Sequence, residues 1–360
     1  MLSIRIKDST LRKATSNGGK MDTSNIPMVA GRKSALPKIY GDTPSFLGCP
    51  VIKSKAQINK FDVAVLGVPW EGTITWGSYS GCELAPKTIR HAAARYGGFL
   101  PEYGINLFDY LEIGDFGDVG IEPSNPAKTM KKIGQKVKEI YEGGAIPISI
   151  GGDHSFTPEI VRALGEYSAS QIGVIHFDAH LDNTPEFGGD KYPRCGPLYR
   201  IAQIPQVKRT SIVHLGIRGP RNAPAQAEYA KSIGARILTI KDIRELGIEE
   251  VINRAISTAY DGTKAVYVTI CSDVVDVGFN PGGAIDFDGL TPHELFYALH
   301  QLGKEGISGL DFVEVYPLQD PCGYSSHLAA WAMIHALVGM ALKIKMNSVR
   351  RSVIQEKAVL

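Results

Sequence analysis

Three residues of metal-binding types stand two positions apart at the end of an apolar run. In the stretch VIHFDAHLDNTPEFGG, residues 174–189, they are Asp178, His180 and Asp182. If the strand continues extended, alternate side chains point the same way, so two carboxylates and an imidazole converge. Such a cluster is costly to desolvate without a cation. The pattern therefore predicts a divalent metal site. A surface hydrogen-bond network is the weaker alternative, because the preceding run is typical of a buried strand.

A second apolar run ends in a glycine turn followed by an acid and an imidazole. In ISIGGDHSF, residues 148–156, two glycines turn the chain and Asp153 and His154 precede a helix that Ser155 could cap. The turn lacks the GKS/T and GxGxxG patterns, so it gives little support to a nucleotide-binding protein or dehydrogenase. Taken alone, His154 would be interpreted as a hydrogen-bonded structural histidine.

A third run, VYVTICSDVVDVGFNPGG over residues 266–283, ends in the same manner. Cys271 and Asp273 stand two apart at the end of an apolar strand, and Asp276 follows shortly after. These groups could join the cluster from a neighbouring strand. A small buried thiol is the local alternative for Cys271.

The elements that must position these residues alternate along the chain from about residue 61. Strands are expected at 61–68, 146–152, 172–178, 211–217, 235–240, 265–271 and 310–315. Helices are expected at 85–96, 127–143, 155–166, 222–233, 248–260, 291–303 and 326–344. The strands are apolar throughout, which predicts an α/β fold: a single three-layer domain with a mostly parallel sheet flanked by helices. Ligands of such sheets bind at the carboxyl ends of the strands, where all three clusters lie.

The ends of the chain differ in composition from its middle. Residues 1–50 lack periodicity and predict an N-terminal arm that is partly flexible or contacts another subunit. Residues 51–345 form the predicted catalytic domain, and residues 346–360 a C-terminal tail. The apolar run at 328–344 contains a histidine and is interpreted as a buried core helix rather than a membrane span.

Charge and cysteine content restrict the class of partner. Lys plus Arg number 39 and Asp plus Glu number 37, so no electrostatic field favours nucleic acid or a membrane, while a small cationic ligand remains compatible. The five cysteines include no CxxC pair, which argues against disulfides and a thiolate zinc site. We therefore expect free thiols and a cytoplasmic location.

The three stretches together resemble the ureohydrolase family, which includes arginase and agmatinase. GGDHS and DAHxD, two signatures of that family, match in full, and FVEVYP at residues 312–317 matches its late strand. The resemblance covers roughly residues 45–345, with the motifs in the family's order. It implies an arginase-like fold and hydrolysis of a guanidine C–N bond, which releases urea or a substituted urea plus an amine or ammonia.

The resemblance also implies a role for each matching residue. His154, Asp178 and Asp182 would hold one divalent metal ion, and Asp178, His180 and Asp273 the other. Asp153 would support a ligand. Glu314 would grip the cationic guanidine-type substrate, so Asp178, Asp273 and Glu314 are the implied catalytic residues.

One departure from the family pattern affects the metal centre itself. Cys271 stands where the family has an aspartate that bridges both metals. A thiolate is a softer ligand than a carboxylate, so nickel is favoured over manganese. Each metal would still keep three protein ligands.

The substrate side departs too. Trp70, Trp76 and Tyr79 replace an Arg- and Gly-rich stretch, and Cys195 replaces a histidine, so Trp76 and Cys195 join Glu314 as expected substrate-binding residues. These features resemble nickel-dependent guanidine hydrolases and the subunits of metformin (biguanide) hydrolase. The resemblance implies a trimer or hexamer, with a related subunit as an option. A catalytically silent paralogue that completes an active partner subunit is the alternative function.

Overall fold

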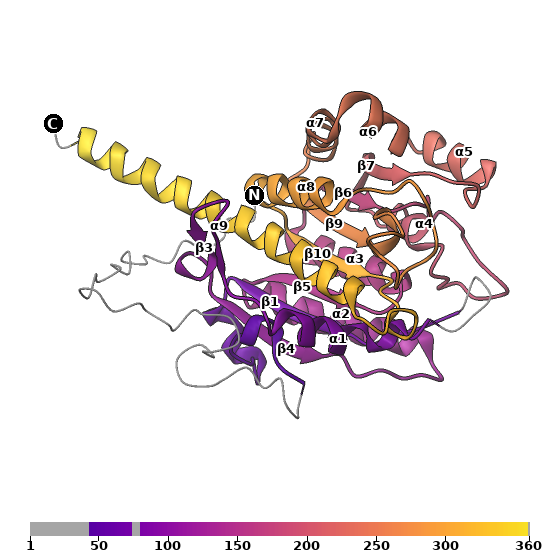
Figure 1. Cartoon of the computed structure of the whole chain (residues 1–360), viewed down its shortest axis with the longest axis horizontal. Coiled ribbons are helices and arrows are strands. Elements are labelled where there is room, and N and C mark those ends of the chain that lie inside the picture. Colours follow the sequence, from indigo (N-terminus) through magenta and orange to yellow (C-terminus); the bar gives the residue numbers. More distant parts are fainter. Residues whose placement is uncertain (1–42, 74–79, 359–360) are drawn as a thin grey trace.

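The computed structural model describes residues 43–73 and 80–358. In these residues, eight strands form one sheet in the order β4-β1-β5-β10-β9-β6-β7-β8, and all neighbouring strands pair in parallel (Figure 1). The strands are β1 Val63–Val68, β4 Ile113–Asp118, β5 Ile146–Gly151, β6 Ile172–Phe177, β7 Val207–Ile217, β8 Arg236–Thr239, β9 Ala265–Cys271 and β10 Gly309–Val313. A separate antiparallel pair joins β2 Phe99–Leu100 to β3 Ile105–Asn106.

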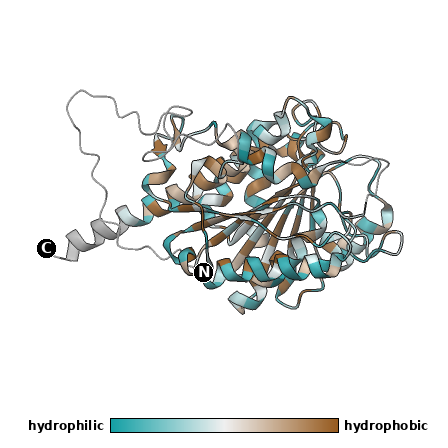
Figure 2. Cartoon of the chain, turned by 90° about the horizontal axis from the view of Figure 1, so that it is seen from below, coloured by the Kyte–Doolittle hydropathy of each residue, from teal (hydrophilic) through white to brown (hydrophobic). Residues whose placement is uncertain are grey.

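Helices cover both faces of the sheet because successive strand residues are apolar and point to opposite sides. In β1, Val63 and Val65 belong to one hydrophobic cluster, and Ala64 and Leu66 belong to the other. Figure 2 shows hydrophobic strands between helices whose outer surfaces are more hydrophilic. The first cluster is covered by α1 Ala85–Ala93, α6 Ile240–Leu246, α7 Ile248–Ala259, α8 Pro292–Glu305 and α9 Tyr324–Ala358, and the second by α2 Pro126–Glu142, α3 Thr157–Ser168, α4 Pro197–Ile201 and α5 Pro224–Ser232. The predicted three-layer α/β fold is confirmed.

Helix α9 holds the apolar run at 328–344. Its stretch Tyr324–Ser348 is long and apolar enough to cross a membrane, with a hydropathy of 1.4, but 72% of that window is buried inside the protein. Met333 and Leu337 are fully buried in the first cluster. The helix therefore serves as a core helix, as predicted.

Two short helices, one strand of the eight-stranded sheet and the short pair β2–β3 were not predicted. Strand β4 escaped prediction because Gly114, Asp115, Gly117 and Asp118 interrupt its apolar pattern. Helices α4 and α6 have five and seven residues, too short to show a clear helical period.

The structure describes part of each predicted terminal segment. Phe46 and Leu47 of the predicted arm are buried in the core, because apolar side chains there pack against α1 and its neighbours. Residues 1–42 lie outside the described residues. The predicted tail is helical to Ala358, because α9 continues without a break and extends beyond the body of the protein (Figure 1).

Candidate metal centre

The chain leaves β6 at Phe177, so the extended continuation predicted for residues 178–182 is wrong. Asp178 N still donates to Leu215 O of β7 at 3.0 Å, but side chains accept the next two backbone hydrogen bonds. His180 N donates to Asp178 Oδ1 at 2.6 Å, and Ala179 N donates to Asp273 Oδ1 at 3.1 Å. Asp182 adopts a left-handed φ of 50°. The three side chains nevertheless converge on one cluster, because this turn gathers them in place of strand alternation.

The first group of ligand atoms surrounds the His154 imidazole. His154 Nδ1 lies 3.3 Å from Asp178 Oδ2 and 3.2 Å from Asp182 Oδ2. It is fully buried, yet it has no hydrogen-bond partner. A bare ring nitrogen that faces two carboxylates at this range is the donor set expected of a divalent metal site.

The other ring nitrogen of His154 is fixed by a buried chain of hydrogen bonds. Thr269 Oγ1 donates to Asp311 Oδ1 at 2.5 Å, and His154 Nε2 lies 2.8 Å from the same hydroxyl oxygen. Because that hydroxyl proton goes to Asp311, the threonine oxygen accepts from Nε2–H. This leaves the Nδ1 lone pair free for a metal, as metal-binding histidines require.

The second group shares Asp178 with the first. His180 Nδ1 lies 3.2 Å from Asp178 Oδ1 and 3.1 Å from Asp273 Oδ2. The ligand atoms of Asp178, Cys271 and Asp273 all lie within 4.8 Å of one another. The structure thus brings together all six residues predicted to hold metal, in two groups joined by Asp178.

The electric field of this cluster favours a positive charge. Burial alone would lower the pKa of His154, but the approach of its ring to the carboxylates of Asp178 and Asp182 raises that pKa well above the ordinary value. Burial opposes ionisation of Asp178 as well, yet the neighbouring histidines hold its pKa well below the ordinary range. Protons or metal cations can satisfy this field, and a divalent ion brings the larger charge.

The two cysteines at the site are protonated at neutral pH when no metal is bound. Burial, followed by the charges of Asp178 and Asp273, raises the pKa of the Cys271 thiol well above its usual value. Burial raises the pKa of Cys195 to about 11, with the charge of Asp182 adding to the effect. Cys271 would become a thiolate ligand only with a metal beside it.

The structure adds residues that sequence reasoning missed. His176 Nε2 lies 2.9 Å from Asp178 Oδ2, within hydrogen-bonding distance, and so helps to fix the position of that carboxylate. Asp286 Oδ2 lies 3.2 Å from His180 Nε2 and also pairs with Arg221. His176 precedes Asp178 by two positions, so the alternation argument could have found it. Asp286 lies in a loop, and no local pattern marks it.

Glu314 follows β10 directly, in a left-handed conformation with a φ of 61°. Its Oε1 accepts from His154 N at 2.7 Å, which ties it to the metal-binding turn. Its Oε2 accepts from Tyr316 OH at 2.6 Å and from Arg194 Nη1 at 3.2 Å. Burial raises the pKa of Glu314 to about 7, and the Arg194 charge opposes that rise. The carboxylate predicted to grip the substrate already has an internal guanidinium partner.

The remaining predicted residues fall outside the cluster. Asp153 accepts hydrogen bonds from Ser155 N and Gly72 N, so it shapes the glycine turn. Trp70 is buried and donates to Ser155 Oγ at 3.1 Å, which favours packing over substrate contact. Asp276 accepts from two glycine amides in a turn and is not among the clustered ligand atoms. Trp76 and Tyr79 lie outside the described residues.

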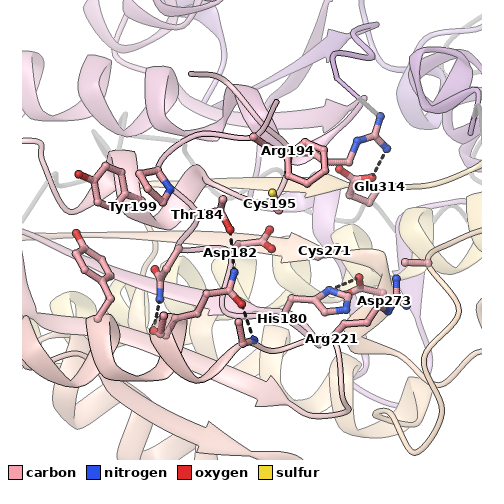
Figure 3. Close-up of a pocket in the computed structure, with 18 of the residues that line it drawn as sticks. His180, Asp182, Thr184, Arg194, Cys195, Tyr199, Arg221, Cys271, Asp273 and Glu314 are labelled. Carbon is pink, nitrogen blue, oxygen red and sulfur yellow. Dashed lines mark hydrogen bonds and ion pairs between the residues drawn. The ribbon is translucent and has the colours of Figure 1, made fainter. Parts of the chain in front are cut away.

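A cavity of about 630 Å³ opens onto the cluster (Figure 3). This volume lies within the range of small-molecule sites. His180, Asp182, Cys271, Asp273 and Glu314 line it with Arg194 and Cys195, as Figure 3 shows. Its lining also includes Pro185, Phe187, Tyr199, Ala223 and Tyr229. The cavity thus joins a charged floor to a largely apolar wall.

Comparison with known proteins matches residues 61–339 to the model of the arginase family. The guanidinopropionase of Pseudomonas aeruginosa is 28% identical over 323 residues, which are 89% of this chain and 95% of that enzyme. The structure of proclavaminate amidinohydrolase from Streptomyces clavuligerus matches with a TM-score of 0.77 and 28% identity, over 85% of this chain and 99% of that one. Formiminoglutamase of Trypanosoma cruzi, solved with Mn²⁺, shares the fold at 22% identity and a TM-score of 0.75, over 83% and 99% of the two chains.

Proposed function

The chain belongs to the arginase family, and from this membership we propose that it hydrolyses a C–N bond of a small guanidine or biguanide at two divalent metal ions. Its similarity to guanidinopropionase and to proclavaminate amidinohydrolase supports amidino-hydrolase activity on guanidino compounds. The observation that carries the proposal is the unpartnered Nδ1 of His154, which faces the carboxylates of Asp178 and Asp182. The products would be urea or a substituted urea and an amine or ammonia.

In this proposal, each residue keeps the role that its position supports. His154, Asp178 and Asp182 hold one ion, and Asp178, His180 and Asp273 hold the other. Bound divalent ions supply a water of lowered pKa as the nucleophile. The Cys195 thiol in the cavity wall remains protonated at neutral pH and can donate a hydrogen bond to the substrate or the leaving group.

Nickel in preference to manganese is the finer part of the proposal. It rests on Cys271, whose ligand atom lies within 4.8 Å of those of Asp178 and Asp273. Sulfur is a soft donor and suits nickel better than manganese. Separate loading with each metal, followed by measurement of metal content and urea release, tests this preference.

A second candidate function is a catalytically silent subunit that stabilises or completes an active relative. The replacement of a bridging carboxylate by Cys271 favours it, since a neutral thiol leaves the cluster one negative charge short. A trimer or hexamer, with one or two kinds of chain, and a cytoplasmic location belong to the proposal as well. Native mass spectrometry of the chain purified from its own cells would identify a related partner subunit.

Metal content and urea release test the main proposal together. We expect about two metal ions per chain and release of urea from a member of a panel of guanidine, biguanides and guanidino acids. Asp178→Ala should remove metal and lower the rate at least about a hundredfold, because the shared ligand is lost. Asp261→Ala changes an exposed aspartate paired with Lys208 and is the matched control. A fully active Asp178→Ala variant would refute the two-metal site.

A further inference from the structure

The side chain of Arg194 lies at the floor of the cavity among three carboxylates. Its Nη1 donates to Glu314 Oε2 at 3.2 Å, and its Nη2 donates to Glu71 Oε1 at 3.0 Å. Asp153 Oδ2 is 3.8 Å from the same Nη2. The arginine is only 5% exposed. A guanidinium group of this chain therefore rests on the carboxylate at which a substrate guanidinium would be expected.

The arrangement uses up the hydrogen-bonding capacity that Glu314 directs into the cavity. Oε2 accepts from both Arg194 and Tyr316, and Oε1 accepts from the backbone of His154. Figure 3 shows Arg194 reaching over Glu314 from the loop that also carries Cys195. A second guanidinium at Glu314 would meet a like charge and find no free acceptor on Oε2.

Arg194 is also held on its far side, so its position is not that of a loose surface side chain. Its Nε donates to the backbone oxygen of Thr73 at 3.4 Å. Glu71, its second carboxylate partner, accepts hydrogen bonds from Ser80 and from the backbone of Gly81. Three carboxylates and one backbone oxygen thus fix the guanidinium in one place, in the forked geometry that suits arginine and not lysine.

We propose that Arg194 is a specificity-determining residue: its guanidinium occupies the guanidinium place at Glu314, so a free guanidinium ion binds there only when Arg194 is displaced or removed. The inference rests on the proposed function, in which the family resemblance makes Glu314 the residue that binds the substrate guanidinium. It concerns binding alone, and requires neither bound metal nor turnover for its test.

The experiment measures guanidinium binding to full-length wild type and Arg194→Ala by calorimetry and by thermal shift. Guanidinium chloride at millimolar concentration is the probe, with sodium chloride and neutral urea as controls. The variant should bind guanidinium about 10- to 100-fold more tightly than wild type, the range of one or two charge-assisted hydrogen bonds. It should also gain thermal stability from guanidinium but not from urea. Equal binding by the two proteins would overturn the proposal.

Two further variants locate any gain. Arg194→Ala combined with Glu314→Gln should lose the added affinity, and retention of it would place the site elsewhere and overturn the proposal. Arg221→Ala removes another cavity-lining arginine, which pairs with Asp286, and should show no gain. An equal gain of guanidinium affinity in Arg221→Ala would show that removal of any positive charge from the cavity is enough, and it would overturn the proposal too.

If Arg194→Ala fails to fold, two other experiments test the proposal: refolding of that variant in guanidinium, and guanidinium binding by the single variant Glu314→Gln. Recovery of folded protein by guanidinium, and not by urea, supports the proposal. In the wild-type background, Glu314→Gln should leave guanidinium binding unchanged, because Arg194 already blocks that place. A tenfold or greater loss of binding would show that Glu314 is open to ligands and would contradict the proposal. Failure of the proposed hydrolysis would appear separately, as wild type without metal and without urea release.

Discussion

Replacing Cys271 by aspartate should make the stability of this protein depend on metal. The side chain is only 3% exposed, and its sulfur lies within 4.8 Å of ligand atoms of Asp178 and Asp273. Without metal, Cys271→Asp adds a carboxyl group to a buried cluster that already holds those of Asp178, Asp182 and Asp273. An uncompensated buried charge costs about 3–5 kcal/mol. If the new carboxyl group takes up a proton instead, part of that cost remains, because a buried polar group still needs hydrogen-bond partners.

The expected change in melting temperature follows from the size of the chain. At about 2.1 cal/mol/K per residue, 360 residues give an unfolding entropy near 0.8 kcal/mol/K. A loss of 3–5 kcal/mol then lowers the midpoint by about 4–7 °C in chelator. Metal at a hundred times its dissociation constant returns about 2.7 kcal/mol, or roughly 3–4 °C. Cys271→Ser is the matched control, because serine is small and uncharged.

Differential scanning fluorimetry with chelator, manganese or nickel, joined to metal analysis by mass spectrometry, measures both effects. The prediction is refuted if metal-free Cys271→Asp has the same melting temperature as Cys271→Ser, or if metal raises the melting temperature of both variants equally. In either case a carboxylate at position 271 does not join the ligands. If Cys271→Asp binds more metal but loses activity, the thiolate is a working ligand rather than a deficit.

Three other perturbations test separate parts of the structure. Thr269→Val removes the hydroxyl that accepts from His154 Nε2 and should weaken metal binding about 10- to 100-fold in a chelator competition, while circular dichroism stays unchanged. Arg90→Ala strands the buried Asp115 carboxylate and should cost about 3–5 kcal/mol in urea denaturation; a loss below 1 kcal/mol would contradict a buried ion pair. Burial lowers the pKa of His300 to about 4, so the unfolded chain takes up a proton below about pH 6.5 that the folded one refuses. Wild type should therefore lose stability as pH falls from 6.5 to 4, and His300→Phe should lose less over that window.

The sequence predicted most of the sheet because its strands are buried on both faces and read as unbroken apolar runs. The sequence prediction missed β4, in which the Asp115 carboxylate is buried against Arg90. The charged residues of a buried ion pair are interpreted as exposed when only the sequence is known. The sequence prediction placed the boundaries of the long helices well, since their apolar stripes and their Pro and Thr starts are local signals. The length of α9 was underestimated, because its polar end gives no sign of continued helix.

For the site, motif residues at strand ends were predictable and loop partners were not. His154, Asp178 and Asp273 sit where apolar runs stop, which is a signal within a few residues. Arg194 and Asp286 act through contacts 120 and 106 residues distant, with Glu314 and His180 respectively. Such pairs depend on the path that the loops take over the sheet, and that path cannot be predicted from a single sequence.

The order of strands in the sheet sets when the site can exist during synthesis. Strand β10 is the last strand made, yet it lies between β5 and β9 in the middle of the sheet. Until residue 313 has left the ribosome, one half carries His154 and the other carries Asp178 and Asp273, with an exposed strand edge on each. Unpaired edges invite pairing with other chains, so a stalled or truncated product is an aggregation hazard. The same insertion makes the complete site depend on synthesis beyond residue 313, because within the sheet β10 joins the two halves.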